Sequence, residues 1–74
     1  MAKILVTGAA GKTGRAVIAA LAARGEEVRA FVHRPEAAAS VLAAGAREAA
    51  VGDMLAVDDL RAACRGAAAV YHIC

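Results

Sequence analysis

The first residues with chemical meaning are three glycines at every third position, Gly8, Gly11 and Gly14. Glycine permits a tight turn at the first position, close approach of a diphosphate at the second, and close helix packing at the third. The N–H groups at the start of a helix, with the helix dipole behind them, bind phosphate oxygens. The spacing therefore predicts a diphosphate-binding turn, with a purely structural glycine turn as the alternative.

The positions between these glycines hold Ala10, Lys12 and Thr13. We expect Ala10 to belong to the turn and the Thr13 hydroxyl to add a donor for phosphate. The run Gly11-Lys12-Thr13 also matches the end of a nucleotide P-loop. The first glycine of that motif would fall at position 6, where the chain has Val6 inside an apolar run. This loop is too short to surround a triphosphate, so a P-loop is excluded.

A turn of this kind commonly binds the diphosphate of a nicotinamide dinucleotide. In such proteins an acid about 20 residues beyond the turn usually holds the free ribose 2′-OH of this cofactor. This chain has His33 and Arg34 there. A carboxylate would repel a 2′-phosphate, whereas a guanidinium pairs with it. We therefore predict Arg34 as the 2′-phosphate clamp, with Lys12 and His33 as helpers, and NADP(H) as the cofactor rather than NAD(H). The alternatives are a solvated Arg34 and an ordinary surface His33.

The elements that must position these residues follow from the alternation of apolar runs with alanine-rich segments of helical spacing. Strands are expected at 3–7, 27–32, 47–51 and 68–73, and helices at 13–24, at 35–44 with Pro35 as the first residue, and from Asp58 to near Gly66. Alternating strands and helices with short connections indicate the α/β class with a parallel sheet. Right-handed crossovers give the strand order 3-2-1-4, which is the first half of a Rossmann-like fold. We expect residues 1–74 to be the N-terminal part of one dinucleotide-binding domain, truncated in or after the fourth strand.

The composition limits the size of the core. The chain is 61% hydrophobic, but about a third of it is alanine and only 3% is aromatic. The expected core is Ile4, Val6, Val17, Ile18, Leu21, Val28, Phe31, Val32, Leu42, Val51, Leu60, Val70 and Ile73. That set is thin for an independent domain.

The overall charge and the apolar runs exclude several classes of protein. A net charge of +2 is too small to indicate a nucleic-acid or membrane-surface protein. The first apolar run is too short for a signal sequence or a membrane span, so we expect a cytoplasmic protein. Cys64 and Cys74 have no metal-ligand spacing, and we expect reduced thiols and no metal site.

The segment Thr7-Gly8-Ala9-Ala10-Gly11-Lys12-Thr13-Gly14-Arg15 resembles the turn of NmrA-like and other atypical short-chain dehydrogenase/reductases. The resemblance continues through residues 28–35, Gly52-Asp53-Met54, and Gly66 followed by Val70-Tyr71-His72. It implies that Asp53 and Met54 contact the adenine, with the acid accepting from the exocyclic amine. The alternative for Asp53 is a turn residue that caps the local backbone.

The resemblance implies two functions for the protein: an NAD(P)H-dependent oxidoreductase, or a non-catalytic regulatory protein that senses NADP(H). Short-chain dehydrogenases use a tyrosine with a lysine four residues later, a pair that Tyr71 cannot supply here. His72 and the two cysteines lack a partner arranged for nucleophilic chemistry. We therefore assign no catalytic residue.

Overall fold

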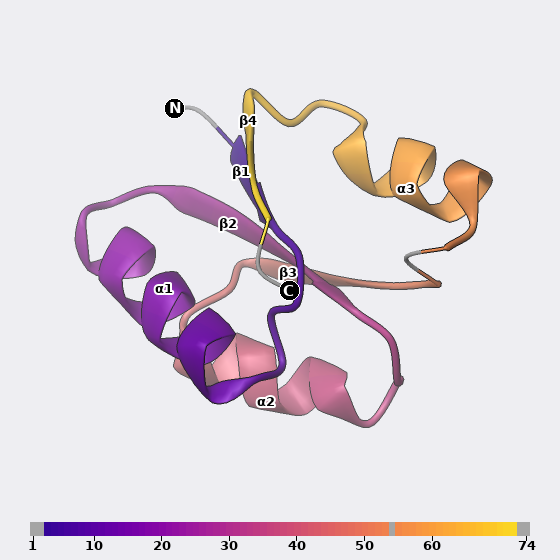
Figure 1. The fold of residues 1–74 in the computed structure, drawn as a ribbon. Helices are drawn as coiled ribbons and strands as arrows, with labels where there is room; N and C mark the ends of the chain where they lie inside the picture. The colour runs from indigo at the N-terminus through magenta and orange to yellow at the C-terminus, as the bar shows by residue number, and fades with distance from the viewer. Residues whose placement is uncertain (1–2, 54, 73–74) are drawn as a thin grey trace.

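The chain forms one parallel sheet with helices on both faces (Figure 1). The computed structural model describes residues 3–53 and 55–72. The strands are β1 (Lys3–Val6), β2 (Glu27–Val32), β3 (Glu48–Val51) and β4 (Ala69–Tyr71). The helices are α1 (Lys12–Ala23), α2 (Ala37–Ala44) and α3 (Val57–Cys64). The sheet order is β3-β2-β1-β4 with every pair parallel, which confirms the predicted Rossmann-like order.

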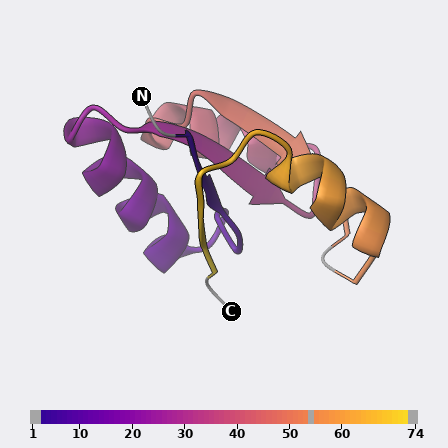
Figure 2. The ribbon, with the colours of Figure 1, turned by 90° about the horizontal axis from the view of Figure 1, so that it is seen from above.

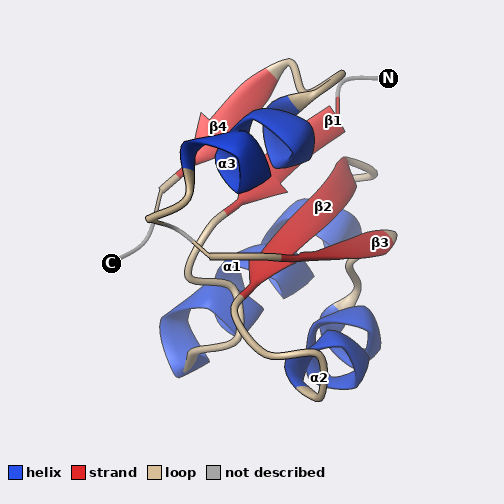
Figure 3. Cartoon of the chain, turned by 90° about the vertical axis from the view of Figure 1, so that its right-hand side faces the viewer, coloured by secondary structure: helices blue, strands red, loops and turns tan. Residues whose placement is uncertain are grey.

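The two faces of the sheet are covered by different helices. Helices α1 and α2 lie together on one face and α3 on the other. Figure 3 is seen from the side of α3, with α1 and α2 behind the strands, and Figure 2 shows the helices from above. Alternate residues of β2 face opposite sides because side chains of a strand alternate. Val28, Ala30 and Val32 join the core beneath α1 and α2, whereas Phe31 joins Leu5 and Ala63 beneath α3.

Most element boundaries agree with the predicted ones to within one or two residues. The strand at 27–32 was predicted at its observed bounds, whereas α2 begins at Ala37 rather than at Pro35. The amides of Ala37 and Ala38 bond to the carbonyls of Arg34 and Pro35, at 3.0 and 3.1 Å. These are three-residue spacings, so Pro35 lies in a tight turn that leads into the helix.

The predicted core was wrong at three positions. Leu42, Val51 and Val70 are 46, 49 and 52% exposed, while Leu5 and Val41, which the prediction omitted, are fully buried. Val51 and Val70 belong to the two edge strands, each of which has a neighbour on one side only. In α2 the neighbouring Val41, and not Leu42, faces the sheet. The remaining predicted members are buried or partly buried, except Ile73, which lies outside the described residues.

A polar network lies on the α3 face, toward the ends where the strands begin. Arg29 donates from Nε to Glu48 and from one terminal nitrogen to the carbonyls of Ala63 and Arg65, the latter at 2.7 Å. Its guanidinium thereby binds the last carbonyls of α3, which have no partner within the helix. The hydrogen bond from Arg29 holds the pKa of Glu48 below its ordinary value of 4.5. Arg29 therefore ties β3 and α3 to β2.

None of the helices in the described part of the chain is long and apolar enough to cross a membrane.

Candidate functional site

The glycine turn links β1 to α1 at the end of the sheet where the strands finish. Gly8 has a φ of +62°, a conformation that side chains disfavour. A Cβ on Gly14 would lie 2.4 Å from the Gly8 carbonyl oxygen and 2.7 Å from that of Ala9. Gly8 therefore turns the chain, as the sequence predicted. Gly14 lets α1 pack against the backbone of the turn, whereas the sequence predicted close packing of the helix on the sheet.

Gly11 is different, because the fold itself leaves room for a side chain there. A Cβ at this position would meet only the Gly8 carbonyl oxygen, at an ordinary 3.7 Å. The residue is exposed and its backbone is extended, with a φ of −73° and a ψ of 169°. Packing therefore does not require glycine here. Glycine is accepted at the N-cap position that this residue occupies, and it leaves the turn open to approach from outside.

The first turn of α1 offers uncapped backbone amides. Gly11 is the N-cap residue, no side chain caps the helix, and no acid lies in its first turn. The first amides of a helix have no partner within the helix. Lys12, Thr13 and Arg15 are exposed around them. This helix start has the amide donors, the dipole and the positive side chains that attract an anion.

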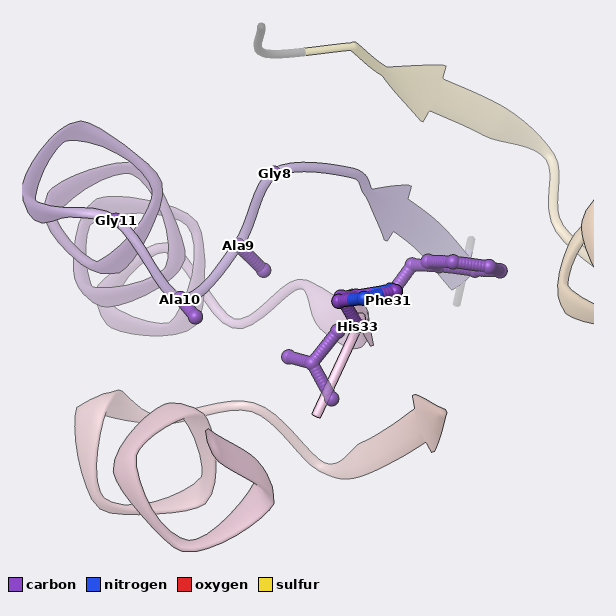
Figure 4. A pocket seen from close by; sticks show the side chains of 7 residues that line it. Gly8, Ala9, Ala10, Gly11, Phe31 and His33 are labelled. Carbon is purple, nitrogen blue, oxygen red and sulfur yellow. The ribbon is translucent and has the colours of Figure 1, made fainter. Parts of the chain in front are cut away.

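An open hollow of about 180 Å³ lies beside this turn, between it and the end of β2 (Figure 4). It is lined by Gly8, Ala9, Ala10, Gly11, Phe31, Val32 and His33. Ligand pockets for drug-sized molecules are typically about 300–1,000 Å³, so this hollow would hold part of a dinucleotide. The structure thus brings together four of the predicted site residues, namely Gly8, Ala10, Gly11 and His33.

Two exposed residues that can carry positive charge, His33 and Arg34, follow β2 directly. His33 lines the hollow, and Arg34 is the next residue along the chain. No acid occurs in the chain from Val32 to Pro35, and the first one after the strand is Glu36, the N-cap residue of α2. Along the chain, the residues that follow β2 therefore present the cation Arg34 before any carboxylate.

Asp53 follows β3 but does not line the hollow. Its Oδ1 accepts the amide of Leu55 at 2.9 Å, and its own amide donates to Asp59 Oδ2 at 2.8 Å. The turn-capping role considered for Asp53 is therefore present in the structure. The adenine contact stays a prediction, and its other predicted member, Met54, lies outside the described residues.

Sequence reasoning missed two features of the site. Ala9, Phe31 and Val32 line the hollow; their position beside the turn and at the end of the second predicted strand could have indicated this. The second feature is the hydrogen bond between Thr7 Oγ1 and His72 Nδ1, at 2.7 Å. Thr7 follows β1 and His72 follows β4, and these strands are neighbours in the sheet. The predicted strand order therefore already placed both residues at the end of the sheet where the strands finish.

Among the described residues, no group of three or more His, Cys, Asp or Glu side chains could hold a metal ion. Cys64, the cysteine that the structure describes, is an exposed free thiol on α3.

Comparison with known families identifies the class of protein. Residues 8–74 match the model of the NAD(P)H-binding family, so the chain belongs to that family. The match includes the glycine turn, the end of β2 and β4. The family is described by its binding of NAD(P)H.

Individual relatives agree with this assignment. The chain is 44% identical over 68 residues to sterol demethylase protein B of Methylococcus capsulatus. Among solved structures it is similar to a short-chain dehydrogenase/reductase superfamily protein of Agrobacterium tumefaciens with bound NAD (TM-score 0.77, 42% identity, 97% of this chain). It is also similar to a protein described as an NAD-dependent epimerase/dehydratase from Bacillus halodurans (TM-score 0.86, 28% identity, 95% of this chain).

These relatives are much longer. The matched region is 92% of this chain but 20% of the Methylococcus protein, and it covers 20% and 32% of the two solved chains. A polyketide ketoreductase with NADPH shares the fold at a TM-score of 0.83 and 20% identity.

Proposed function

We propose that this chain binds the adenosine diphosphate half of NADP(H), with the diphosphate on the glycine turn and the 2′-phosphate on Arg34. The observation that carries the proposal is the pairing of an uncapped helix start with two exposed residues, His33 and Arg34, directly after β2. Gly8, Ala10, Gly11 and Gly14 supply the turn, and Lys12 and Thr13 add donors to the phosphates. His33 assists Arg34 at the rim of the hollow.

The choice between the two cofactors depends on Arg34. A guanidinium forms charge-assisted, bidentate hydrogen bonds with a phosphate monoester, and an NAD site would leave this cation without that partner. NAD is the competing assignment, because the Agrobacterium relative has NAD bound at 42% identity. We also propose that Asp53 and Met54 contact the adenine. Asp53 Oδ2 supports this role, since it makes no hydrogen bond among the described residues.

We further propose that the chain forms the first four strands of a larger Rossmann domain in an oxidoreductase of the short-chain dehydrogenase/reductase type. The support is the dehydrogenase or epimerase description of the two solved relatives, and the length of those proteins. The exposed β4, with a neighbour on one side only, also favours further sheet beside it. NADPH binding without turnover would instead favour the sensing protein considered above. The cytoplasmic location stays a prediction.

Fluorescence titration of the purified protein with NADPH and NADH tests the cofactor assignment. We expect NADPH to bind at least about tenfold more tightly, because charge-assisted hydrogen bonds contribute about 1.5–3 kcal/mol. Arg34→Ala should remove this preference by weakening NADPH alone. The matched control is Arg24→Ala, which removes an exposed arginine at the other end of α1. Equal affinities for the two cofactors in the unmodified protein, or tighter binding of NADH, would contradict the proposal.

A further inference from the structure

Thr7 is a buried polar residue at the entrance to the glycine turn. It follows β1 directly, precedes Gly8, and is only 1% exposed. A buried hydroxyl without a hydrogen-bond partner is unfavourable, because it loses the water that it binds in the unfolded chain. The Thr7 hydroxyl lies 2.7 Å from Nδ1 of His72, which is 65 positions further along the chain.

His72 is placed for this contact by the pairing of β1 with β4. The last paired residues of the two strands are Val6 and Tyr71, so the residue after each lies at the same end of the sheet. The amide of Thr7 also donates to the carbonyl of Tyr71 at 3.0 Å. Both the backbone and the side chain of Thr7 are thus fixed to the end of β4.

The next residue, Gly8, is held from the opposite side by α1. The Gly8 carbonyl oxygen lies against Gly14, with room for no Cβ there, and it accepts the Gly11 amide at 3.4 Å. The turn is therefore held between two supports: the start of α1, and the end of β4 acting through Thr7. Among the described residues, the support at β4 is the one that includes a side-chain hydrogen bond.

We propose that His72 is a positioning residue for the glycine turn. Through Nδ1 and the Thr7 hydroxyl it fixes the direction in which the chain leaves β1, and so the placement of the amides that follow. A hydroxyl can both donate and accept, so it can bond to either tautomer of the imidazole. The effect on cofactor binding rests on the proposed function, whereas the effect on the turn itself does not.

Two substitutions of similar polarity separate this role from general packing. In His72→Asn the terminal amide atoms are the same number of bonds from Cα as Nδ1 of histidine. In His72→Gln they are one bond further from Cα, like Nε2 of histidine. We expect His72→Asn to retain NADPH affinity to within about threefold and His72→Gln to lose about tenfold, the size of one hydrogen bond to a buried group. Thr7→Ser should resemble His72→Asn, and Thr7→Val should resemble His72→Gln.

The double variant Thr7→Val/His72→Gln tests whether His72 acts through Thr7. If it does, the double variant binds NADPH no more weakly than either single one, because both remove the same contact. Losses that multiply, or equal affinities for His72→Asn and His72→Gln, would overturn the proposal. Thermal melting of each variant shows whether the fold is retained.

Amide hydrogen exchange provides a measurement that needs no cofactor. We expect the amides of Thr7 and Gly11 to exchange faster in His72→Gln than in the unmodified protein, and to stay protected in His72→Asn. Equal exchange in the two variants would overturn the positioning role. If the unmodified protein bound neither NADPH nor NADH, the proposed function would fail, while the exchange rates would still decide whether His72 positions the turn.

Discussion

The two ends of the sheet use their charged residues in opposite ways. Where the strands begin, Lys3 and Arg29 are bonded to the carboxylates of Glu27 and Glu48. Where the strands end, Lys12, Arg15 and Arg34 are exposed and form no ion pair among the described residues. Lys3 and Arg29 at the first end are thus used within the fold, whereas Lys12, Arg15 and Arg34 at the second end are available to a ligand.

The two ends also differ in what shapes them. The glycine turn is shaped mainly by backbone: a left-handed residue, a missing Cβ and an uncapped helix start. The opposite end is held by a long side chain, Arg29, which reaches from β2 to β3 and α3. A turn shaped by the backbone is disrupted when a glycine that its conformation requires is replaced. In a side-chain network, each substitution removes only the contacts of that side chain.

The largest effect is expected at the backbone end. Gly14→Ala should destabilise the protein by about 3 kcal/mol, the upper range for forcing extra atoms into a packed region, because its Cβ would lie 2.4 Å from a carbonyl oxygen. Urea unfolding followed by circular dichroism measures this change. The matched control is Gly11→Ala, whose Cβ meets its neighbour at 3.7 Å. Similar stability losses in both variants would remove the distinction between a packing glycine and a ligand-facing glycine.

A smaller effect is expected at the side-chain end. Arg29→Ala should cost about 2 kcal/mol, because hydrogen bonds that involve charged groups contribute about 1.5–3 kcal/mol and α3 loses the donor to its last carbonyls. The same unfolding experiment measures it. Arg61→Ala, on the exposed surface of α3, is the control and should stay within about 0.5 kcal/mol. If the control lost as much stability, the network would have no special role.

The smallest effect is a pH dependence at the same end. The folded-state pKa of Glu48 is lowered by Arg29, so ionised Glu48 stabilises the fold above its ordinary value of 4.5, and this stabilisation is lost as the pH falls through the lowered pKa. Glu48→Gln should therefore be less stable than the unmodified protein near neutral pH, and the gap should narrow as the pH falls below 4.5 and through the lowered pKa. In the Arg29→Ala background, which lacks the guanidinium that lowers the pKa of Glu48, Glu48→Gln should show a smaller gap across the same pH range. A gap for Glu48→Gln that persisted unchanged at low pH would mean that the charge is not involved.

Local patterns in the sequence predicted most of the fold. The strand at 27–32 and the order of the sheet followed from the alternation of apolar and helical segments. The turn between β1 and α1 followed from the spacing of Gly8 and Gly14. The orientation of α2 did not, because its sequence AAASVLAA is alanine-rich on every side and gives no apolar stripe to orient it. The choice between Val41 and Leu42 was made by packing against the sheet.

The contacts that the sequence could not predict join distant positions. Arg29 reaches the end of α3 across 34 and 36 positions, and Thr7 meets His72 across 65. Spacing rules describe neighbours along one helix or strand, and they do not reach partners of this kind. The cofactor assignment of Arg34, His33, Asp53 and Met54 likewise stays a prediction, since it depends on a ligand and not on the fold.

The pairing of β1 with β4 has a consequence for the order of events during synthesis. Thr7 is made 65 residues before His72, which at about 5–20 residues per second is a delay of roughly 3–13 seconds. The helix α1 and strand β2 emerge within that interval and supply the contacts that are near in sequence, which form fastest. In the nascent chain the glycine turn can therefore already contact α1, but Thr7 lacks its contacts with β4 and His72 until the fourth strand has been made.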